Sequence, residues 1–565
     1  MKKLFLLLLF LSSVSLLISQ QSFQNVASLM GISGQSGLGH AVGWGDIDND
    51  GDPDLGFSNQ DGSGFWFYRN DIDSFTNITN SAGLSGLSAN KIIICELNGD
   101  EFNDLLIRTL SGTQKLFKSN GDGTFTDIST SSGVSAAAVY NIADFNNDGY
   151  TDLLSVTSNN YSILYNDGLA NFSSSEIIAP LPDFMGVAIL DYNNDGLMDI
   201  YGTTYGNSPN QLLRNNGDGS FSDETVEAGL EYDTRGHGLD VGDFNNDGFV
   251  DVYVGSYSSS RGELCKLFKN NGDGTFSDAT ATTNTFGHDD TRTTTFADYN
   301  NDGWLDIFSS HHDFYSYSNT MQKSMFGVLF EEVAQELGIS GEWIGDYFGL
   351  GWADYNLDGA IDFFAAGHID KYRLFENQDC PGTSISVKLK GIISNPNGIG
   401  ARVEVKTTAG KINRFMLPDG GKHDFSELKL VIGLDGAYST DSLTIYWPSG
   451  IKQELGSINA GENLVIIEDT LTTNILESNT HHNPTKIWPL PANNKLNVEF
   501  YLLNGGEINI SLISLNTLTE ISFINETLKE GLFTRILDAN ELLPGIYILK
   551  ITKNNHSEFH KILII

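Results

Sequence analysis

Short apolar stretches, separated by turns rich in Gly, Asn and Asp, recur through residues 20–380. Within one repeat, a small-residue segment is followed by a β-rich stretch, as in Asp152-Leu-Leu-Ser-Val. An apolar pair such as Leu116-Phe117 then precedes a turn, and a segment led by Phe follows, as at Phe125. Apolar runs of this length, bounded by turn residues, predict β-strands. Each repeat therefore predicts four short strands.

The most regular part of the repeat is an acidic nonapeptide with the pattern Asp-x-[Asp/Asn]-x-Asp-Gly-x-x-Asp. Seven copies stand 47 to 56 residues apart, and they begin at Asp46, Glu96, Asp144, Asp191, Asp243, Asp298 and Asp354. Four-stranded units at this period are typical of β-propeller blades, which protect their sheet edges by closing into a ring. We therefore expect an all-β chain: a seven-bladed β-propeller in residues 20–380, then a small β domain and a C-terminal β-sandwich.

The Phe-led segments indicate how the ring closes. Six of them follow acidic peptides, beginning at Phe75, Phe125, Phe172, Phe221, Phe276 and Phe330. The seventh repeat runs through Phe375 into Cys380 without such a segment, whereas a similar one begins at Phe23, before the first repeat. We expect the N-terminal strand to complete the last blade.

The acidic peptides predict about six Ca²⁺ sites. Oxygen side chains stand at positions 1, 3, 5 and 9, a backbone carbonyl at position 7 can join them, and Gly at position 6 permits a sharp turn. Asx turns use the same residue types, but six near-intact copies favour metal sites, since clustered carboxylates repel one another without a cation. The expected ligands are Asp46, Asp48, Asp50, Asp54, Asp144, Asn146, Asp148, Asp152, Asp191, Asn193, Asp195, Asp199, Asp243, Asn245, Asp247, Asp251, Asp298, Asn300, Asp302, Asp306, Asp354, Asn356, Asp358 and Asp362.

The second copy of the peptide departs from the pattern, and we call it the worn copy. Glu96 replaces the first Asp and Glu101 replaces the Gly, so we expect weak or absent metal binding there. Position 12 lacks the Glu of an EF-hand, for example at Ser155. The Asn-Gly-Asp-Gly turns at Asn120, Asn216 and Asn271 are expected to connect hairpins.

The composition of the chain disfavours some classes of binding partner. The chain has 72 acidic and 32 basic residues and a formal net charge of −40, which disfavours nucleic acid and anionic membranes as partners. Cys95, Cys265 and Cys380 are an odd number placed far apart, so buried free thiols are expected.

The N-terminus predicts export. Two lysines precede an apolar run over residues 4–18, so residues 1–19 indicate a signal peptide. A membrane anchor is the alternative, but the run is shorter than the roughly 20 residues that span a bilayer. No comparable run occurs later, and we expect no transmembrane segment in the mature chain.

Two further units follow the repeats. Residues 381–468 are β-rich and contain Asn397-Gly-Ile-Gly-Ala-Arg-Val and Trp447-Pro-Ser-Gly. Residues 469–483 are polar and predict a linker. Residues 484–565 begin near Trp488-Pro-Leu-Pro and end in Lys561-Ile-Leu-Ile-Ile.

These motifs resemble known families. The repeats resemble FG-GAP or VCBS repeats, which also build integrin α-chain propellers. Residues 381–468 resemble the ASPIC and UnbV domain, in the order found in the cartilage acidic protein family. Residues 484–565 resemble the C-terminal sorting domain of type IX secretion. The resemblance implies a secreted or surface-bound, calcium-binding adhesion or ligand-binding module. Its partners would be the secretion machinery and an extracellular glycan or protein.

No catalytic constellation is evident, although a propeller-based carbohydrate-active enzyme, of polysaccharide lyase or hydrolase type, is the alternative. It would need a general acid and base. His40, His237 and Arg292 stand six residues before their acidic peptides and could converge at the mouth of the central channel. The simpler interpretation is that they are polar ends of strands.

Overall fold

The computed structural model describes residues 23–565 apart from short stretches. The stretches left out are 61–63, 158–159, 181–183, 205–207, 233–235, 237, 257–264, 288–290, 312–318, 341–348, 368–371, 379, 381, 422, 470–476, 479–485, 489–494, 503–505, 515–519, 530, 541, 544, 554–555 and 565. The predicted signal peptide, residues 1–19, and His237 lie outside the described residues.

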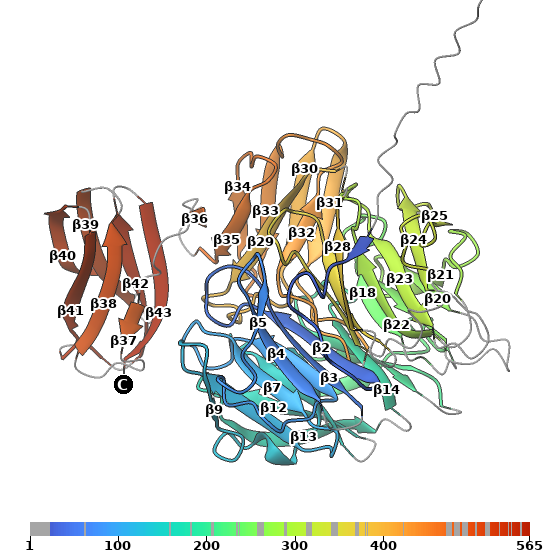
Figure 1. Cartoon of the computed structure of the whole chain (residues 1–565), viewed down its shortest axis with the longest axis horizontal. Coiled ribbons are helices and arrows are strands. Elements are labelled where there is room, and N and C mark those ends of the chain that lie inside the picture. The colour runs from blue at the N-terminus through green and yellow to red at the C-terminus, as the bar shows by residue number, and fades with distance from the viewer. Residues whose placement is uncertain are drawn as a thin grey trace, which may run out of the picture.

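The described part of the repeats forms seven four-stranded antiparallel sheets (Figure 1). Apart from a short 3₁₀ turn at Val134–Ala136, the described secondary structure is all β, as predicted. The innermost strands are β2 (Gly39–Gly45), β6 (Lys91–Cys95), β10 (Val139–Ala143), β14 (Phe184–Leu190), β18 (Leu239–Gly242), β22 (Thr291–Ala297) and β26 (Gly349–Ala353). The second strands are β3 (Asp54–Asn59), β7 (Asp104–Arg108), β11 (Asp152–Thr157), β15 (Asp199–Thr204), β19 (Asp251–Val254), β23 (Asp306–His311) and β27 (Asp362–Ala366).

The outer half of each sheet begins after the second strand. The third strands are β4 (Phe65–Asn70), β8 (Gln114–Ser119), β12 (Asn160–Asn166), β16 (Gln211–Asn215), β20 (Lys266–Asn270), β24 (Thr320–Met325) and β28 (Tyr372–Asn377). The outermost strands are β5 (Phe75–Asn77), β9 (Phe125–Asp127), β13 (Phe172–Pro180), β17 (Phe221–Asp223), β21 (Phe276–Asp278), β25 (Leu329–Glu332) and β1 (Phe23–Asn25). The three Asn-Gly-Asp-Gly turns connect third to outermost strands, as predicted.

Small residues in the innermost strands let neighbouring sheets approach closely. A Cβ added to Gly43 or Gly45 of β2 would lie 2.7 or 2.5 Å from the side chains of Ile92 or Ile94 in β6. Atoms cannot approach so closely without a shift of the backbone. These glycines of β2 therefore allow close contact between the first and second sheets.

The predicted closure by the N-terminal strand is confirmed. β1 pairs with β28 in antiparallel register, with Phe23 opposite Asn377. The Phe23 side chain is buried, and its ring lies 5.3 Å from that of Phe363 and 6.4 Å from that of Trp352. The last sheet therefore joins two segments separated by more than 300 residues.

We expect deletion of residues 23–32 to cause aggregation, because β28 would then present unpaired backbone groups at a sheet edge. Phe23→Ala should cost about 3–5 kcal/mol of unfolding free energy but leave the protein monomeric. Light scattering and thermal melts of both variants check this. A deletion variant that stays monomeric and melts like the wild type would contradict the closing role of β1.

The second unit is a two-sheet domain with its own apolar core, built from residues such as Val403, Leu443 and Ile445. In one sheet β29 pairs with β32 and, in parallel, with β35, which also carries β36. Glu468 fastens the end of this domain by accepting hydrogen bonds from the backbone N–H groups of Ile392, Ile393 and Ser394. The strands of the second unit are β29 (Ser384–Lys390), β30 (Arg402–Thr407), β31 (Gly410–Phe415), β32 (Leu430–Gly433), β33 (Ser442–Tyr446), β34 (Lys452–Leu455), β35 (Asn463–Ile467) and β36 (Glu477–Ser478).

The third unit also has two sheets around a separate core that includes Leu496, Leu512 and Leu549. The strand β36 falls within the predicted linker, most of which lies outside the described residues. The strands of the third unit are β37 (Lys486–Trp488), β38 (Lys495–Leu502), β39 (Gly506–Ser514), β40 (Glu520–Leu528), β41 (Gly531–Asp538), β42 (Gly545–Lys553) and β43 (His556–Ile564).

Candidate metal centre

All seven acidic peptides form loops between an innermost strand and the second strand, so they gather at one end of the ring. The Asp at position 9 opens the second strand in every copy and is buried. Its Oδ1 accepts a hydrogen bond from the backbone N–H of the third strand, at 2.8 Å for Asp54 and Asn70 and 2.7 Å for Asp362 and Asn377. Its Oδ2 accepts a backbone N–H of the loop, as from Ile47 to Asp54 at 2.8 Å, so this carboxylate ties the second and third strands to the loop.

The Asn at position 4 links consecutive loops. Asn49, Asn147, Asn194, Asn246 and Asn301 have left-handed φ angles between 54° and 60°. Each Nδ2 donates to the backbone oxygen at position 6 of the next loop, over distances of 2.7 to 3.2 Å. Gly99 and Leu357 occupy position 4 in the other two loops and cannot make this bond. The loops thus form a mutually braced series with two interruptions.

The first loop concentrates carboxylates. Ligand atoms of Asp46, Asp48 and Asp50 lie within 4.8 Å of one another. Burial raises the pKa of Asp48 to about 6, and the carboxylates of Asp50 and Asp46 add to the shift. Asp52, at position 7, was not among the sequence-predicted ligands. Burial and the same neighbours raise its pKa to about 8.

Three loops hold buried carboxylate oxygens without a hydrogen-bond partner. Asp46, Asp298 and Asp354, each at position 1, have such an Oδ1 atom, and Asp48 and Asp52 of the first loop have another each. A buried carboxylate oxygen without a hydrogen-bond partner is costly, so in each of these loops the Oδ1 atoms fit a bound cation.

In the third, fourth and fifth loops, position 1 is hydrogen-bonded within the loop. Both oxygens of Asp144, for example, accept backbone N–H groups, from Asp148 at 3.1 Å and Gly149 at 2.8 Å. Asn146 donates its Nδ2 to Asp148, over 2.8 Å. The Oδ1 atom of Asn146 accepts the backbone N–H of Asp148 at 3.1 Å, so a cation in this loop would have to replace these internal hydrogen bonds.

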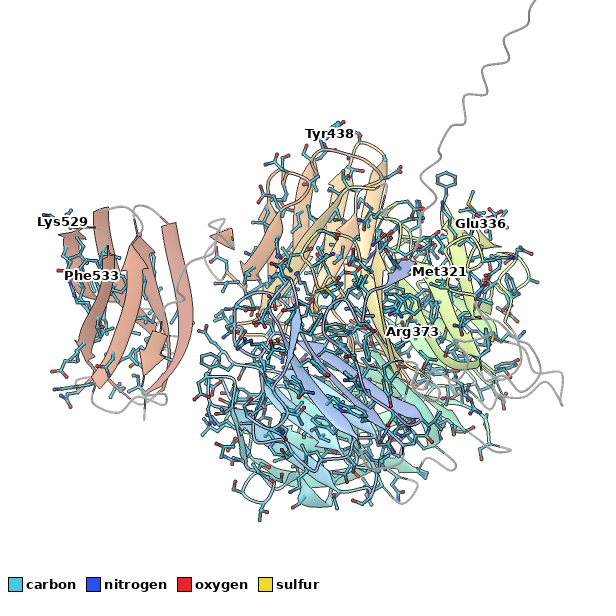
Figure 2. The ribbon with its side chains drawn as sticks, viewed as in Figure 1. Met321, Glu336, Arg373, Tyr438, Lys529 and Phe533 are labelled. Atoms are coloured by element: carbon cyan, nitrogen blue, oxygen red, sulfur yellow. The ribbon has the colours of Figure 1, made fainter. Side chains whose placement is uncertain are left out.

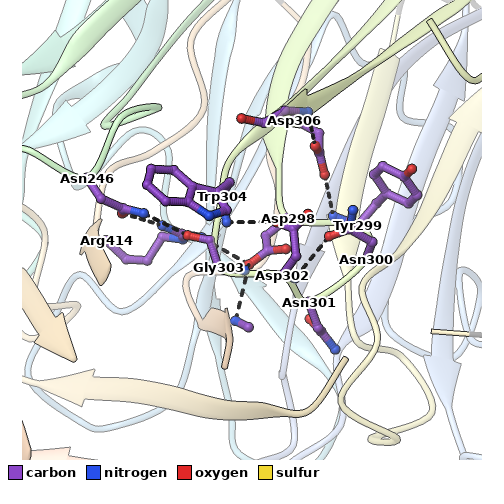
Figure 3. Close-up of polar contacts among 12 residues, drawn as sticks. Asn246, Asp298, Tyr299, Asn300, Asn301, Asp302, Gly303, Trp304, Asp306 and Arg414 are labelled. Carbon is purple, nitrogen blue, oxygen red and sulfur yellow. Dashed lines mark hydrogen bonds and ion pairs between the residues drawn. The ribbon is translucent and has the colours of Figure 1, made fainter. Parts of the chain in front are cut away.

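Basic residues of the second unit contact the position 1 carboxylates of the first and sixth loops, and a third basic residue acts electrostatically on that of the seventh. Figure 3 shows Arg414 beside Asp298, where Nη2 and Oδ2 are 3.0 Å apart and both side chains are buried. The same Oδ2 accepts the backbone N–H of Gly433 at 3.2 Å. Lys388 contacts Asp46 at 3.2 Å, and the Lys429 ammonium opposes the burial that raises the pKa of Asp354 to about 7. The second unit therefore lies on the loop end of the ring.

The worn second loop is held by protein groups. Oε1 of Glu96 accepts the backbone N–H of Asn98 at 2.7 Å and also that of Gly99. The Lys118 ammonium lies 2.9 Å from Asp100, and Asn98 Nδ2 donates to Asp104 over 2.6 Å. Weak or absent metal binding in this loop stays a prediction.

A segment of the second unit fills the space inside the ring. We call residues 419–427, apart from residue 422, the channel segment. The backbone N–H groups of Val42 and Trp44 donate to the carbonyls of His423 and Phe425, and the Leu350 N–H donates to Asp424 Oδ1 at 2.7 Å. Its contacts reach all seven innermost strands, through Val42, Trp44, Lys91, Asn141, Gly186, Asp240, Thr293, Leu350 and Trp352.

One of the residues predicted to converge at the channel mouth, His40, contacts the channel segment instead of open space. His40 is buried, and its ring centroid lies 4.2 Å from that of His423. His423 Nδ1 is 2.7 Å from the carbonyl oxygen of Asn90. Arg292 stands near the start of β22, and His237 is outside the described residues.

Comparison with protein families finds a match within each of the three units. A family described as FG-GAP-like repeat matches residues 144–202, 191–254 and 256–309. ASPIC and UnbV matches residues 391–473, and a secretion system C-terminal sorting domain matches residues 486–565. The three resemblances predicted from the sequence are confirmed.

The curated relatives include cartilage acidic protein 1. The Homo sapiens protein is 26% identical over 287 residues, which make up 46% of this chain and 40% of that protein. The Xenopus tropicalis protein is 32% identical over 163 residues, 28% of this chain and 24% of that protein. The chain thus spans less than half the length of these relatives.

Among solved structures, the V. cholerae biofilm matrix protein Bap1 is similar with a TM-score of 0.29 and 9% identity, over 96% of this chain and 76% of Bap1. AofleA from Arthrobotrys oligospora is similar with a TM-score of 0.31 and 13% identity, over 52% of this chain and 85% of AofleA.

Proposed function

We propose that this protein is an extracellular binding or adhesion module whose loops are braced by calcium. The proposal fits a chain that carries FG-GAP-like repeats, an ASPIC and UnbV segment and a secretion system C-terminal sorting domain. The sorting domain indicates a secreted or cell-surface protein, and none of the described helices could cross a membrane. The observation that carries the proposal is the set of buried, unpartnered carboxylate oxygens in the first, sixth and seventh acidic loops.

In this proposal calcium binds the six near-intact loops through the side chains at positions 1, 3, 5 and 9. In the first loop Asp52 adds a further carboxylate. Hard carboxylate oxygens are the ligands that calcium prefers. The cation would neutralise the clustered carboxylates and hold the end of each second strand against its loop. Rigid loops would then hold the sheets, and the surfaces that the sheets expose elsewhere, in a fixed arrangement.

The matched repeat and ASPIC and UnbV families are not typical of enzymes. The channel segment occupies the space inside the ring, next to His40. The loop end is covered by the second unit, through Arg414 and Lys388. We therefore expect an extracellular glycan or protein to bind the outer rim or the opposite end.

A glycan and protein array, probed with the purified full chain, tests this function. We expect selective binding that is lost in EDTA and restored by excess CaCl₂, since calcium stabilises only the folded loops. Asp148→Ala should weaken binding, and Asp100→Ala in the worn loop is the matched control. Binding that is unchanged by EDTA and by Asp148→Ala would contradict the role of calcium. Turnover of an arrayed polysaccharide would favour an enzyme.

We expect truncation before Pro484 to leave a folded protein that accumulates in the periplasm. The third unit has its own core, so its removal should leave the ring and the second unit intact. Cell fractionation with antibody detection checks the distribution of both forms. If the truncated chain still reached the cell surface or the medium, the third unit would not act in sorting.

A further inference from the structure

The hairpin between β24 and β25 carries adjoining exposed apolar side chains. Met325, Phe326, Val328 and Leu329 are 38%, 69%, 63% and 47% exposed, and we call these four residues the apolar tip. Figure 2 marks this sheet with Met321, in β24, and Glu336, beyond β25. Large apolar side chains gathered at one exposed point are typical of interaction sites.

Equivalent hairpins show that the fold does not require an apolar tip here. The turns between β8 and β9, β16 and β17, and β20 and β21 are Asn-Gly-Asp-Gly. Their polar side chains close the turn: Asn120 Nδ2 donates to Thr124 Oγ1 at 2.9 Å, and Asn271 Nδ2 donates to Thr275 Oγ1 at 3.0 Å. A polar sequence therefore suits this position in the sheet.

The backbone of the apolar tip is strained at Phe326. The N–H of Val328 donates to the carbonyl of Met325 at 3.2 Å, and Phe326 and Gly327 between them have φ angles of 60° and 65°. Turns with two left-handed central residues favour Asn-Gly. Among the described residues, Phe326 is the only aromatic with a left-handed φ. Its ring is largely exposed, so burial within the chain does not offset the strain.

The sixth acidic loop packs against this turn. A Cβ on Gly327 would lie 2.6 Å from the ring of Trp304, which holds position 7 of that loop. The apolar tip is therefore built on a loop that we propose to bind calcium, and its position depends on the same scaffold.

We propose that the apolar tip inserts into an apolar pocket with a basic rim on a partner protein. The proposal rests on the binding function proposed above. Glu331, Glu332 and Glu336 follow the tip, and Lys323 pairs across the strands with Glu331, so the surroundings are acidic on balance. The whole chain carries a net charge of −40, which disfavours a second copy and an anionic membrane as the occupant. A projecting aromatic that fills a pocket, with charge complementarity around it, is a common anchor of protein interfaces.

The first test needs no partner. Phe326→Asn in the purified full chain should raise the melting temperature by about 1–2 °C, because Asn tolerates the left-handed backbone better. Phe330→Asn, at the neighbouring buried ring, should lower it strongly. A lower melting temperature for Phe326→Asn than for the wild type would show that the exposed ring stabilises the chain itself, which would overturn the proposal.

The second test identifies the occupant. A photo-crosslinking phenylalanine placed at position 326 of the exported full chain should form an adduct with a different protein, and Glu331→Lys with Glu336→Lys should reduce it at least tenfold. The same label at Thr124, in a polar hairpin, is the matched control. No adduct, an adduct of two copies, a lipid adduct, or one indifferent to charge reversal would overturn the proposal. If array binding persists in Phe326→Asn, the binding function stands and the apolar tip is not its site.

Discussion

A chain that ends at Cys380 is expected to lack a closed, cooperatively folded ring. Removing the second unit leaves the backbone N–H groups of Val42, Trp44 and Leu350 without their partners in the channel segment. It also leaves the fully buried Lys91 ammonium, whose pKa is lowered by burial, without the Asp424 carbonyl and the nearby carboxylates. Unsatisfied buried groups of this kind are among the most destabilising changes a core can suffer.

Size-exclusion chromatography and near-ultraviolet circular dichroism check this expectation. A chain that ends at Ser478 is the matched control, since it keeps both sheets of the second unit, and it should be monomeric with a sharp thermal transition. Asp424→Ala in the full chain removes the acceptor of the Leu350 N–H and should lower the melting temperature by several degrees. A monomeric chain ending at Cys380 that melts within a few degrees of the control would contradict the role of the channel segment.

Without calcium, the free energy of unfolding should fall as pH rises from about 4 to about 8.5. Burial raises the pKa of Asp144 and Asp191 to about 6, of Asp243 to about 7, and of Asp152 and Asp199 to about 8. The folded state therefore holds protons that the unfolded state, with carboxyl pKa values near 4, has already released. Stability contributed in this way is present at low pH and is lost as pH rises through the folded-state values.

Calcium competes with those protons, so its stabilising effect should grow with pH. Melting temperatures measured across this range in EDTA and in millimolar CaCl₂ check the expectation. We expect the difference between the two curves to widen by several degrees towards pH 8.5, and Asp148→Asn to narrow it while Asp100→Asn does not. Curves that coincide, or that stay parallel at every pH, would contradict it.

The repeat architecture could be predicted because each unit carries its own signals. The acidic peptide sets the period, the Asn-Gly-Asp-Gly turns mark hairpins, and the Phe-led segment at Phe23 identifies the strand missing from the last sheet. These signals lie within about 50 residues, where turn chemistry and strand patterns are local.

The contacts between units could not be predicted in this way. The channel segment meets the innermost strands across hundreds of residues, and neither Asp424 nor Lys91 stands in a periodic pattern. Arg414 gives no local sign that it will reach Asp298. The Asn links between loops were also missed, because position 4 varies among Asn, Gly and Leu in the sequence. The left-handed backbone and the Nδ2 bond to the next loop favour Asn there, and both appear only in the structure.

The central claim, that the acidic loops hold calcium, is tested most directly by the metal content of the purified full chain. After equilibration in micromolar CaCl₂ and removal of free ions, inductively coupled plasma mass spectrometry should find about six Ca²⁺ per chain, in line with the six near-intact loops. Asp148→Ala combined with Asp247→Ala should lower the content by about two, and Asp100→Ala should leave it unchanged. A chain that retains no calcium, or whose calcium content is indifferent to Asp148 and Asp247, would contradict the claim.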